Sequence, residues 1–277
     1  MQPLEIGVCA WSIDRQDTVG VFATIREQLG LGVTQLGFFG RQAVEAAEPQ
    51  RVRAAAAAAR VEIVATFVGF DGQDYSSIAA IARTGGFVPD EFWDERFELT
   101  RRAAELTREL GVGQLGLHIG AIPTERPSPE YNSLARRTQQ MADLLDDRGL
   151  TALVETGPDS VETLTAFLDS LERENLQVGF DPGNLVTYGS GDAVQAAAQL
   201  RGRIGLVHVK DATASSKPGV EWGQEAFPGT GDADIPRVIS KLRAGGYRGP
   251  LLIERRTSGG VGDIPECRDY IRSLIGG

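Results

Sequence analysis

Cysteine and histidine are scarce in this chain of 277 residues, which contains only two of each. The cysteines, Cys9 and Cys267, lie far apart in the sequence, so they make neither a disulfide framework nor a CxxC metal pair. We therefore expect both thiols to be reduced and to have structural roles.

Positive charge is also in short supply. The 28 lysine and arginine residues face 38 aspartate and glutamate residues, which gives a formal net charge of -10 at pH 7. A protein with this charge repels phosphate backbones and anionic membrane surfaces. We therefore expect no nucleic acid and no membrane among its partners.

Long apolar runs are missing as well. No run reaches the roughly 18 residues that are needed to span a bilayer. The N-terminal sequence MQPLEIGVCAWSI lacks the basic region and the long apolar core of a secretory signal. These absences lead us to expect a soluble, cytoplasmic protein. A homo-oligomer is compatible with the sequence.

Short apolar runs alternate with longer helical patterns along the whole chain. This alternation is typical of repeated βα units on a parallel sheet. The runs that we interpret as strands are residues 5–11, 34–39, 62–68, 114–119, 151–156, 176–181, 204–209 and 250–255. The patterns that we interpret as helices are residues 17–30, 41–60, 91–110, 131–148, 160–174, 191–201, 234–245 and 264–275.

Eight strand–helix repeats predict an α/β fold, a (β/α)8 TIM barrel in one domain over residues 1–277. A doubly wound open sheet is the main alternative, but no GxGxxG motif follows the first strand. Two long connections, residues 69–90 and 211–233, follow strands 3 and 7 at the end where barrel enzymes place their binding loops.

Four consecutive predicted strands end with a charged or metal-binding side chain. Side chains alternate between the two faces of a strand, so Leu206 and His208 share one face, and the strands of Glu155 and Glu254 have the same pattern. If that face is the barrel interior, the side chains converge. The four residues are Glu155, Asp181, His208 and Glu254.

Three carboxylates that are buried close together repel one another unless a cation neutralises them. Carboxylate oxygens with one imidazole suit one divalent metal ion, Mn²⁺ or Mg²⁺ first and Co²⁺ or Zn²⁺ second. Any one of these residues alone is more commonly a helix cap, an ion pair or a structural histidine. Their recurrence on four neighbouring strands favours a shared metal site.

Several longer phrases resemble the xylose-isomerase-like TIM-barrel superfamily of sugar phosphate isomerases and epimerases. They are GFDPGN at 179–184, VHVKD at 207–211, PGTGDADI at 228–235 and GGYRGPLLIE at 245–254. The resemblance implies that Glu155, Asp181, His208 and Glu254 hold a divalent metal. It also implies that Glu155 and Glu254 act as the acid and base that move a proton beside a carbonyl group.

Two positions depart from the ketose 3-epimerases of this superfamily. Asn184 stands where those enzymes usually have a histidine, and Ala214 stands where they usually have an arginine. These departures argue against a standard ketose 3-epimerase. We keep Asn184 among the substrate-binding candidates.

Other polar residues near the predicted strand ends are candidates for substrate contact. Lys210 lies on the same face as His208, where it could donate to a substrate oxygen or pair with a carboxylate such as Asp211. His118 ends strand 4 and either touches substrate or packs behind the site. Arg256 either binds an anionic substrate group or lies on the surface.

Aromatic residues at the strand ends are further candidates. Trp11, Phe39 and Phe67 could form an apolar wall for the carbon face of a sugar, although aromatic residues more commonly fill cores. Trp222 and Phe227, in the long connection after strand 7, could close over the site. The glycines of PGTGD more simply serve a turn than a phosphate cradle.

The resulting hypothesis is a metal-dependent isomerase or epimerase of a sugar or a related small polyhydroxy carbonyl compound. A carboxylate can remove the proton from a carbon beside a carbonyl group only if the resulting enediolate is stabilised. A metal ion can supply this stabilisation. One alternative is a dehydratase of the inosose or dehydroshikimate type, which begins with the same proton abstraction. The others are an apurinic endonuclease-like hydrolase and a non-catalytic sugar binder, and scarce histidine and negative charge disfavour the hydrolase.

Overall fold

The computed structural model describes residues 4–14, 17–256 and 260–276. Eight parallel strands form a closed barrel, in the spatial order β1, β10, β7, β6, β5, β4, β3, β2. The strands are β1 (Ile6–Cys9), β2 (Val33–Phe39), β3 (Glu62–Gly69), β4 (Gln114–Leu117), β5 (Thr151–Glu155), β6 (Leu176–Phe180), β7 (Ile204–Val209) and β10 (Leu251–Ile253). The predicted (β/α)8 barrel is confirmed.

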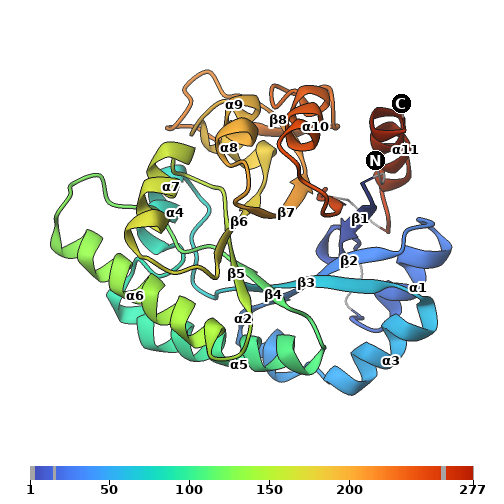
Figure 1. Ribbon diagram of the computed structural model, residues 1–277, viewed down its shortest axis with the longest axis horizontal. Coiled ribbons are helices and arrows are strands. Elements are labelled where there is room, and N and C mark those ends of the chain that lie inside the picture. The colour runs from blue at the N-terminus through green and yellow to red at the C-terminus, as the bar shows by residue number, and fades with distance from the viewer. Residues whose placement is uncertain (1–3, 15–16, 257–259, 277) are drawn as a thin grey trace.

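Helices surround the barrel, and Figure 1 shows the last of them beside the start of the chain, where β1 pairs with β10 and closes the sheet. The helices that follow the barrel strands are α1 (Gly20–Glu27), α3 (Pro49–Ala59), α5 (Trp93–Glu109), α6 (Pro129–Asp146), α7 (Val161–Ser170), α9 (Ala193–Gln199), α10 (Ile235–Ala244) and α11 (Ile264–Ile275).

The single helix that we predicted over residues 41–60 is wrong. The structure divides this stretch into α2 (Gly40–Glu45) and α3, which begins at Pro49. Proline lacks an N–H group and disfavours the helical region for the residue before it, and Glu48 is accordingly extended. The alanine tract at 54–59 does lie in α3, as its helix propensity requires.

The long connections contain structure that the sequence patterns did not indicate. Residues 69–90 include α4 (Ile78–Thr84) and the 3₁₀ turn η2 (Asp90–Phe92), and residues 211–233 include the antiparallel pair β8 (Asp211–Thr213) and β9 (Gln224–Ala226). A further helix, α8 (Pro182–Tyr188), follows β6 directly. Its N-cap is Asp181, whose Oδ1 accepts a hydrogen bond from the backbone N–H of Asn184.

A small cluster of buried apolar side chains from six of the eight strands forms the floor of the barrel interior. Leu153, Leu206 and Leu252 belong to this cluster and are at most 1% exposed. Each lies two residues before Glu155, His208 or Glu254, so the two-residue period of a strand places these polar side chains one layer above the apolar floor. The remaining members are Cys9, Val33 and Ala65.

No helix within residues 4–14, 17–256 and 260–276 is long and apolar enough to cross a membrane. Residues 1–3, 15–16, 257–259 and 277 lie outside the described residues. The prediction of one domain over residues 1–277 stays a prediction.

Candidate metal centre and active site

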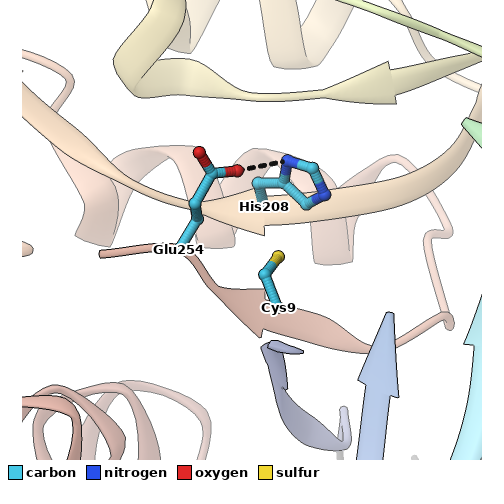
Figure 2. A group of neighbouring side chains, drawn as sticks. All are labelled: Cys9, His208 and Glu254. Atoms are coloured by element: carbon cyan, nitrogen blue, oxygen red, sulfur yellow. Dashed lines mark ion pairs between the residues drawn. The ribbon is translucent and has the colours of Figure 1, made fainter. Parts of the chain in front are cut away.

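The side chains of Glu155, Asp181, His208 and Glu254 meet at the carboxyl end of the barrel strands. One ligand atom from each lies within 4.8 Å of the others. His208 Nδ1 is 2.9 Å from Glu155 Oε1 and 3.0 Å from Glu254 Oε2. Figure 2 shows the second of these pairs, with Glu254 and His208 pointing toward each other from neighbouring strands. Asp181 and His208 are buried, and Glu155 is nearly so.

Lys210 joins this cluster directly after β7. Its Nζ lies 2.8 Å from Glu254 Oε1 and 3.3 Å from Asp181 Oδ2, and it donates to Asn184 Oδ1 at 3.1 Å. Gly183 makes room for the lysine stem, because a Cβ at this position would lie 2.7 Å from Lys210 Cγ. Lys210 therefore pairs with carboxylates of the cluster and not with the adjacent Asp211.

Burial and charge act against each other at the three carboxylates. Burial raises the pKa of Asp181 to about 6, although Lys210 opposes this shift. Burial also disfavours ionised Glu254, but Lys210 and His208 outweigh it and hold the pKa of this residue at about 2. The pKa of Glu155 lies below its ordinary range because His118 and His208 outweigh its burial. Of the three carboxylates, Asp181 is thus the one whose negative charge the protein's own groups do not stabilise enough to offset burial.

The donor set fits a divalent cation. Asp181 Oδ2 is buried and accepts no hydrogen bond from the described residues, which is costly for a carboxylate oxygen. Three carboxylates and one imidazole present mostly hard oxygen ligands, which suit Mg²⁺ or Mn²⁺ and also admit Co²⁺ or Zn²⁺. A divalent ion among these side chains would satisfy the orphaned oxygen.

Gln35, on β2, orients the histidine of this cluster. Its amide Nε2 donates to the carbonyl oxygen of Thr66 at 3.0 Å, so Oε1 must face His208 Nε2, which lies 2.7 Å away. Nε2 of His208 is therefore the nitrogen that carries the proton, and in the neutral ring the lone pair of Nδ1 faces the carboxylates. The sequence reasoning missed Gln35, although a buried glutamine within the apolar run TQLGFF was a signal.

Cys9 lies beside His208 and Glu254 on the barrel floor (Figure 2). Burial raises the pKa of its thiol to about 12, so the thiol is neutral at physiological pH. Cys9 and Cys267 are both buried free thiols. A neutral thiol below three carboxylates leaves the harder oxygen donors as the better ligands for Mg²⁺ or Mn²⁺.

A cavity of about 350 Å³ opens beside the cluster. Glu155, Glu254 and His118 line one part of it, and His118 Nε2 lies 2.9 Å from Glu155 Oε2. Aromatic side chains line another part. Trp11 contacts Phe39 and Phe67 with ring centroids 5.6 Å apart in both pairs. These three aromatic side chains therefore line the same cavity as the carboxylates, and their contact with a sugar stays a prediction.

The sequence model of the family described as "Xylose isomerase-like TIM barrel" matches residues 26–274. The chain belongs to this family. The resemblance inferred from the sequence motifs is thereby confirmed.

Solved structures of xylose isomerase-like proteins share the fold of this chain. A xylose isomerase domain protein from Planctomyces limnophilus is 31% identical, with a TM-score of 0.86, and the match covers 99% of this chain and 98% of that one. A xylose isomerase-like TIM barrel protein from Mycobacterium smegmatis, solved in complex with magnesium, is 16% identical with a TM-score of 0.72, covering 98% and 96% of the two chains.

Among curated proteins, the chain is similar to L-ribulose-5-phosphate 3-epimerase UlaE of Salmonella heidelberg (strain SL476). The two are 23% identical over 227 residues, which are 73% of this chain and 78% of that protein.

In this xylose isomerase-like barrel, two predicted substrate-binding residues lie away from the cavity lining. Asn184 is buried, and its side chain donates to the carbonyl oxygen of Thr156 while its oxygen accepts from Lys210. Arg256 is exposed, and its backbone N–H donates to Glu225 Oε1. Both roles stay predictions, and the contacts of Asn184 indicate that it anchors Lys210.

Two aromatic residues of the long β7–α10 connection pack against other rings. Trp222 contacts Tyr188 with ring centroids 4.8 Å apart, and Phe227 contacts Tyr270 at 6.0 Å. In PGTGD, the backbone N–H groups of Gly229 and Gly231 donate to the Asp211 carboxylate. The glycine-rich turn thus binds an internal carboxylate, and the closing role of Trp222 and Phe227 stays a prediction.

Proposed function

We propose that this chain is a divalent-metal-dependent isomerase or epimerase of a small polyhydroxy carbonyl compound. The observation that carries the proposal is the buried cluster of three carboxylates and one histidine, in which Asp181 Oδ2 accepts no hydrogen bond from the described residues, beside a cavity lined partly by aromatic rings. The curated relative named as a sugar epimerase supports the reaction class.

Glu155, Asp181, His208 and Glu254 would hold the metal. When bound, the ion would act as a Lewis acid that stabilises the negative charge arising when a carbon beside a carbonyl loses its proton. The magnesium complex of the Mycobacterium smegmatis barrel supports a divalent ion in this family.

Glu155 and Glu254 would exchange the substrate proton, one as base and the other as acid. Both line the cavity, and both have a pKa below the ordinary value, so both are ionised at neutral pH, and the residue that serves as the acid would first take up a proton from solvent. Each is held by a second group, Glu155 by His118 and Glu254 by Lys210. His118 and Lys210 fix the positions of the two carboxylates and could also donate hydrogen bonds to substrate oxygens.

The proposed function predicts metal-dependent exchange of substrate hydrogen with solvent. The protein is stripped with a chelator, reloaded with Mn²⁺ and incubated in deuterium oxide with ketoses, aldoses, sugar acids and inososes. Exchange into one carbon position should fall at least about a hundredfold on stripping and return on reloading. Equal exchange with and without metal would refute metal dependence, and loss of water from the product would indicate a dehydratase.

Replacing Gln35 with leucine should weaken Mn²⁺ binding by about ten- to a hundredfold, because His208 loses the acceptor that fixes its tautomer and ring orientation. Calorimetric titration of the metal-free protein measures this directly. Gln35→Glu keeps an acceptor toward His208 and should recover part of the affinity. Gln42→Leu, at an exposed glutamine of α2, is the matched control. Unchanged affinity in a folded Gln35→Leu variant would contradict the assigned role.

A further inference from the structure

The charges of the candidate centre balance when a divalent ion is added. The carboxylates of Glu155, Asp181 and Glu254 carry three negative charges, and Lys210 carries one positive charge. A divalent ion supplies the other two, with His208 neutral as a ligand. The four ligands, Lys210 and the ion therefore sum to no net charge, and His118, which pairs with Glu155, is the further group at the cluster that can carry a positive charge.

Three arginines near the cavity are engaged by this chain's own groups, whereas the exposed Arg256 lies within electrostatic range of Tyr75 in the cavity lining. Arg41 pairs with Glu95 at 3.1 Å and Arg255 with Asp263 at 2.6 Å. Arg96 is buried, and its guanidinium donates to backbone carbonyls behind the cavity wall. No lysine or arginine within the described ranges 4–14, 17–256 and 260–276 lines the cavity itself.

A carboxylate also lines the cavity. Asp71 follows β3 and lines the cavity, and its Oδ2 accepts the backbone N–H of Arg41 at 3.0 Å. It lies so close to Gly40, whose φ is +81°, that a Cβ there would be 2.4 Å from Asp71 Oδ1. The backbone N–H of Arg41, in the first turn of α2, is thus already paired with a negative charge.

We infer that this site takes an uncharged polyhydroxy carbonyl compound and that Asp71 is a specificity-determining residue that disfavours phosphorylated or carboxylated analogues. The inference rests on the proposed function. The aromatic wall of Trp11, Phe39 and Phe67 suits the C–H face of a neutral sugar, whereas a phosphate dianion in the cavity would face Asp71 without a lysine or arginine among the described lining residues to pair with it.

Matched substrate pairs test this inference on the Mn²⁺-loaded protein. Solvent-deuterium exchange is measured for free ketoses and for the same ketoses bearing a terminal phosphate, including L-ribulose and its 5-phosphate. The wild type should prefer the free sugar at least about tenfold in kcat/KM. Asp71→Asn keeps an acceptor for the Arg41 N–H and should narrow this preference about five- to tenfold. Asp146→Asn, an exposed aspartate at the end of α6, should leave the preference unchanged.

Ionic strength separates a charge effect from a merely structural one. Raising the salt from about 0.02 M to about 0.5 M should narrow the preference of the wild type and leave that of Asp71→Asn nearly constant. Three results would overturn the inference while leaving the proposed function intact. The wild type could prefer the phosphorylated sugar, or the preference for the free sugar could be the same in Asp71→Asn. Alternatively, turnover of the phosphorylated sugar could be lost in an Arg256→Gln variant. Absence of exchange with every free and phosphorylated sugar would overturn both.

Discussion

Replacing Glu254 with glutamine should lower the rate of solvent-deuterium exchange by about a thousandfold or more, and Glu155→Gln should do the same. Glutamine has nearly the same volume as glutamate, but it cannot take up a proton and is a much weaker ligand for a divalent ion. Each side chain lines the cavity and contacts His208, so each change removes a charge from the centre of the site. The two variants differ in the charged partners that Lys210 retains. In Glu254→Gln it retains only Asp181, whereas in Glu155→Gln it retains both Asp181 and Glu254.

The matched control is Glu62→Gln, at an exposed residue that begins β3 at the opposite end of the barrel. It should exchange deuterium at the wild-type rate. Measurement at saturating Mn²⁺ separates loss of the proton-transferring group from loss of metal. Retained exchange in both Glu155→Gln and Glu254→Gln would rule out these residues as the acid and base.

Asp181→Asn should have opposite effects on metal affinity and on the stability of the metal-free protein. Removal of a charged oxygen ligand should weaken Mn²⁺ binding by about a hundredfold or more. In the metal-free protein, the same change removes the charge of a buried carboxylate, whose Oδ2 accepts no hydrogen bond from the described residues. Asparagine still caps α8, because its side-chain oxygen can accept from the Asn184 N–H. We therefore expect stabilisation at neutral pH, on the order of 2–3 kcal/mol.

The direction of the Asp181 pKa shift determines how the stability of the metal-free protein changes with pH. Burial raises the pKa of Asp181 from 3.8 to about 6, so between these values the native state binds more protons than the unfolded state. The free energy of unfolding contributed by Asp181 therefore falls as the pH rises through this window. Urea denaturation of metal-free wild type and Asp181→Asn should show a difference that is small near about pH 4 and largest above about pH 6. An Asp181→Asn protein that binds Mn²⁺ as tightly as wild type would contradict the ligand assignment.

The sequence predicted the barrel and the convergence of four side chains because both depend on local periodicity. Leu153, Leu206 and Leu252 mark the inner face of their strands, and the polar residue two positions later must share that face. Parallel strands then bring these residues to one end of the barrel. No knowledge of long-range contacts was needed for either step.

Features that depend on contacts between distant segments could not be predicted in this way. Gln35 and His208 are 173 residues apart, and strand periodicity shows that a glutamine is buried but not what it faces. Arg256 was placed by extending the alternation of Glu254, but β10 ends at Ile253, so the alternation no longer constrains it. Trp11 lies in the 3₁₀ turn η1 (Ala10–Ser12) and not in β1, yet that turn still brings it to the cavity.

The central claim is that a doubly charged ion belongs among Glu155, Asp181, His208 and Glu254. Crystals soaked in Mn²⁺ and measured at a wavelength where manganese scatters anomalously test it most directly. The account predicts one strong anomalous peak per chain, bounded by oxygen atoms of the three carboxylates and by His208 Nδ1. A peak bound elsewhere, or no peak at this cluster at saturating Mn²⁺, would contradict it.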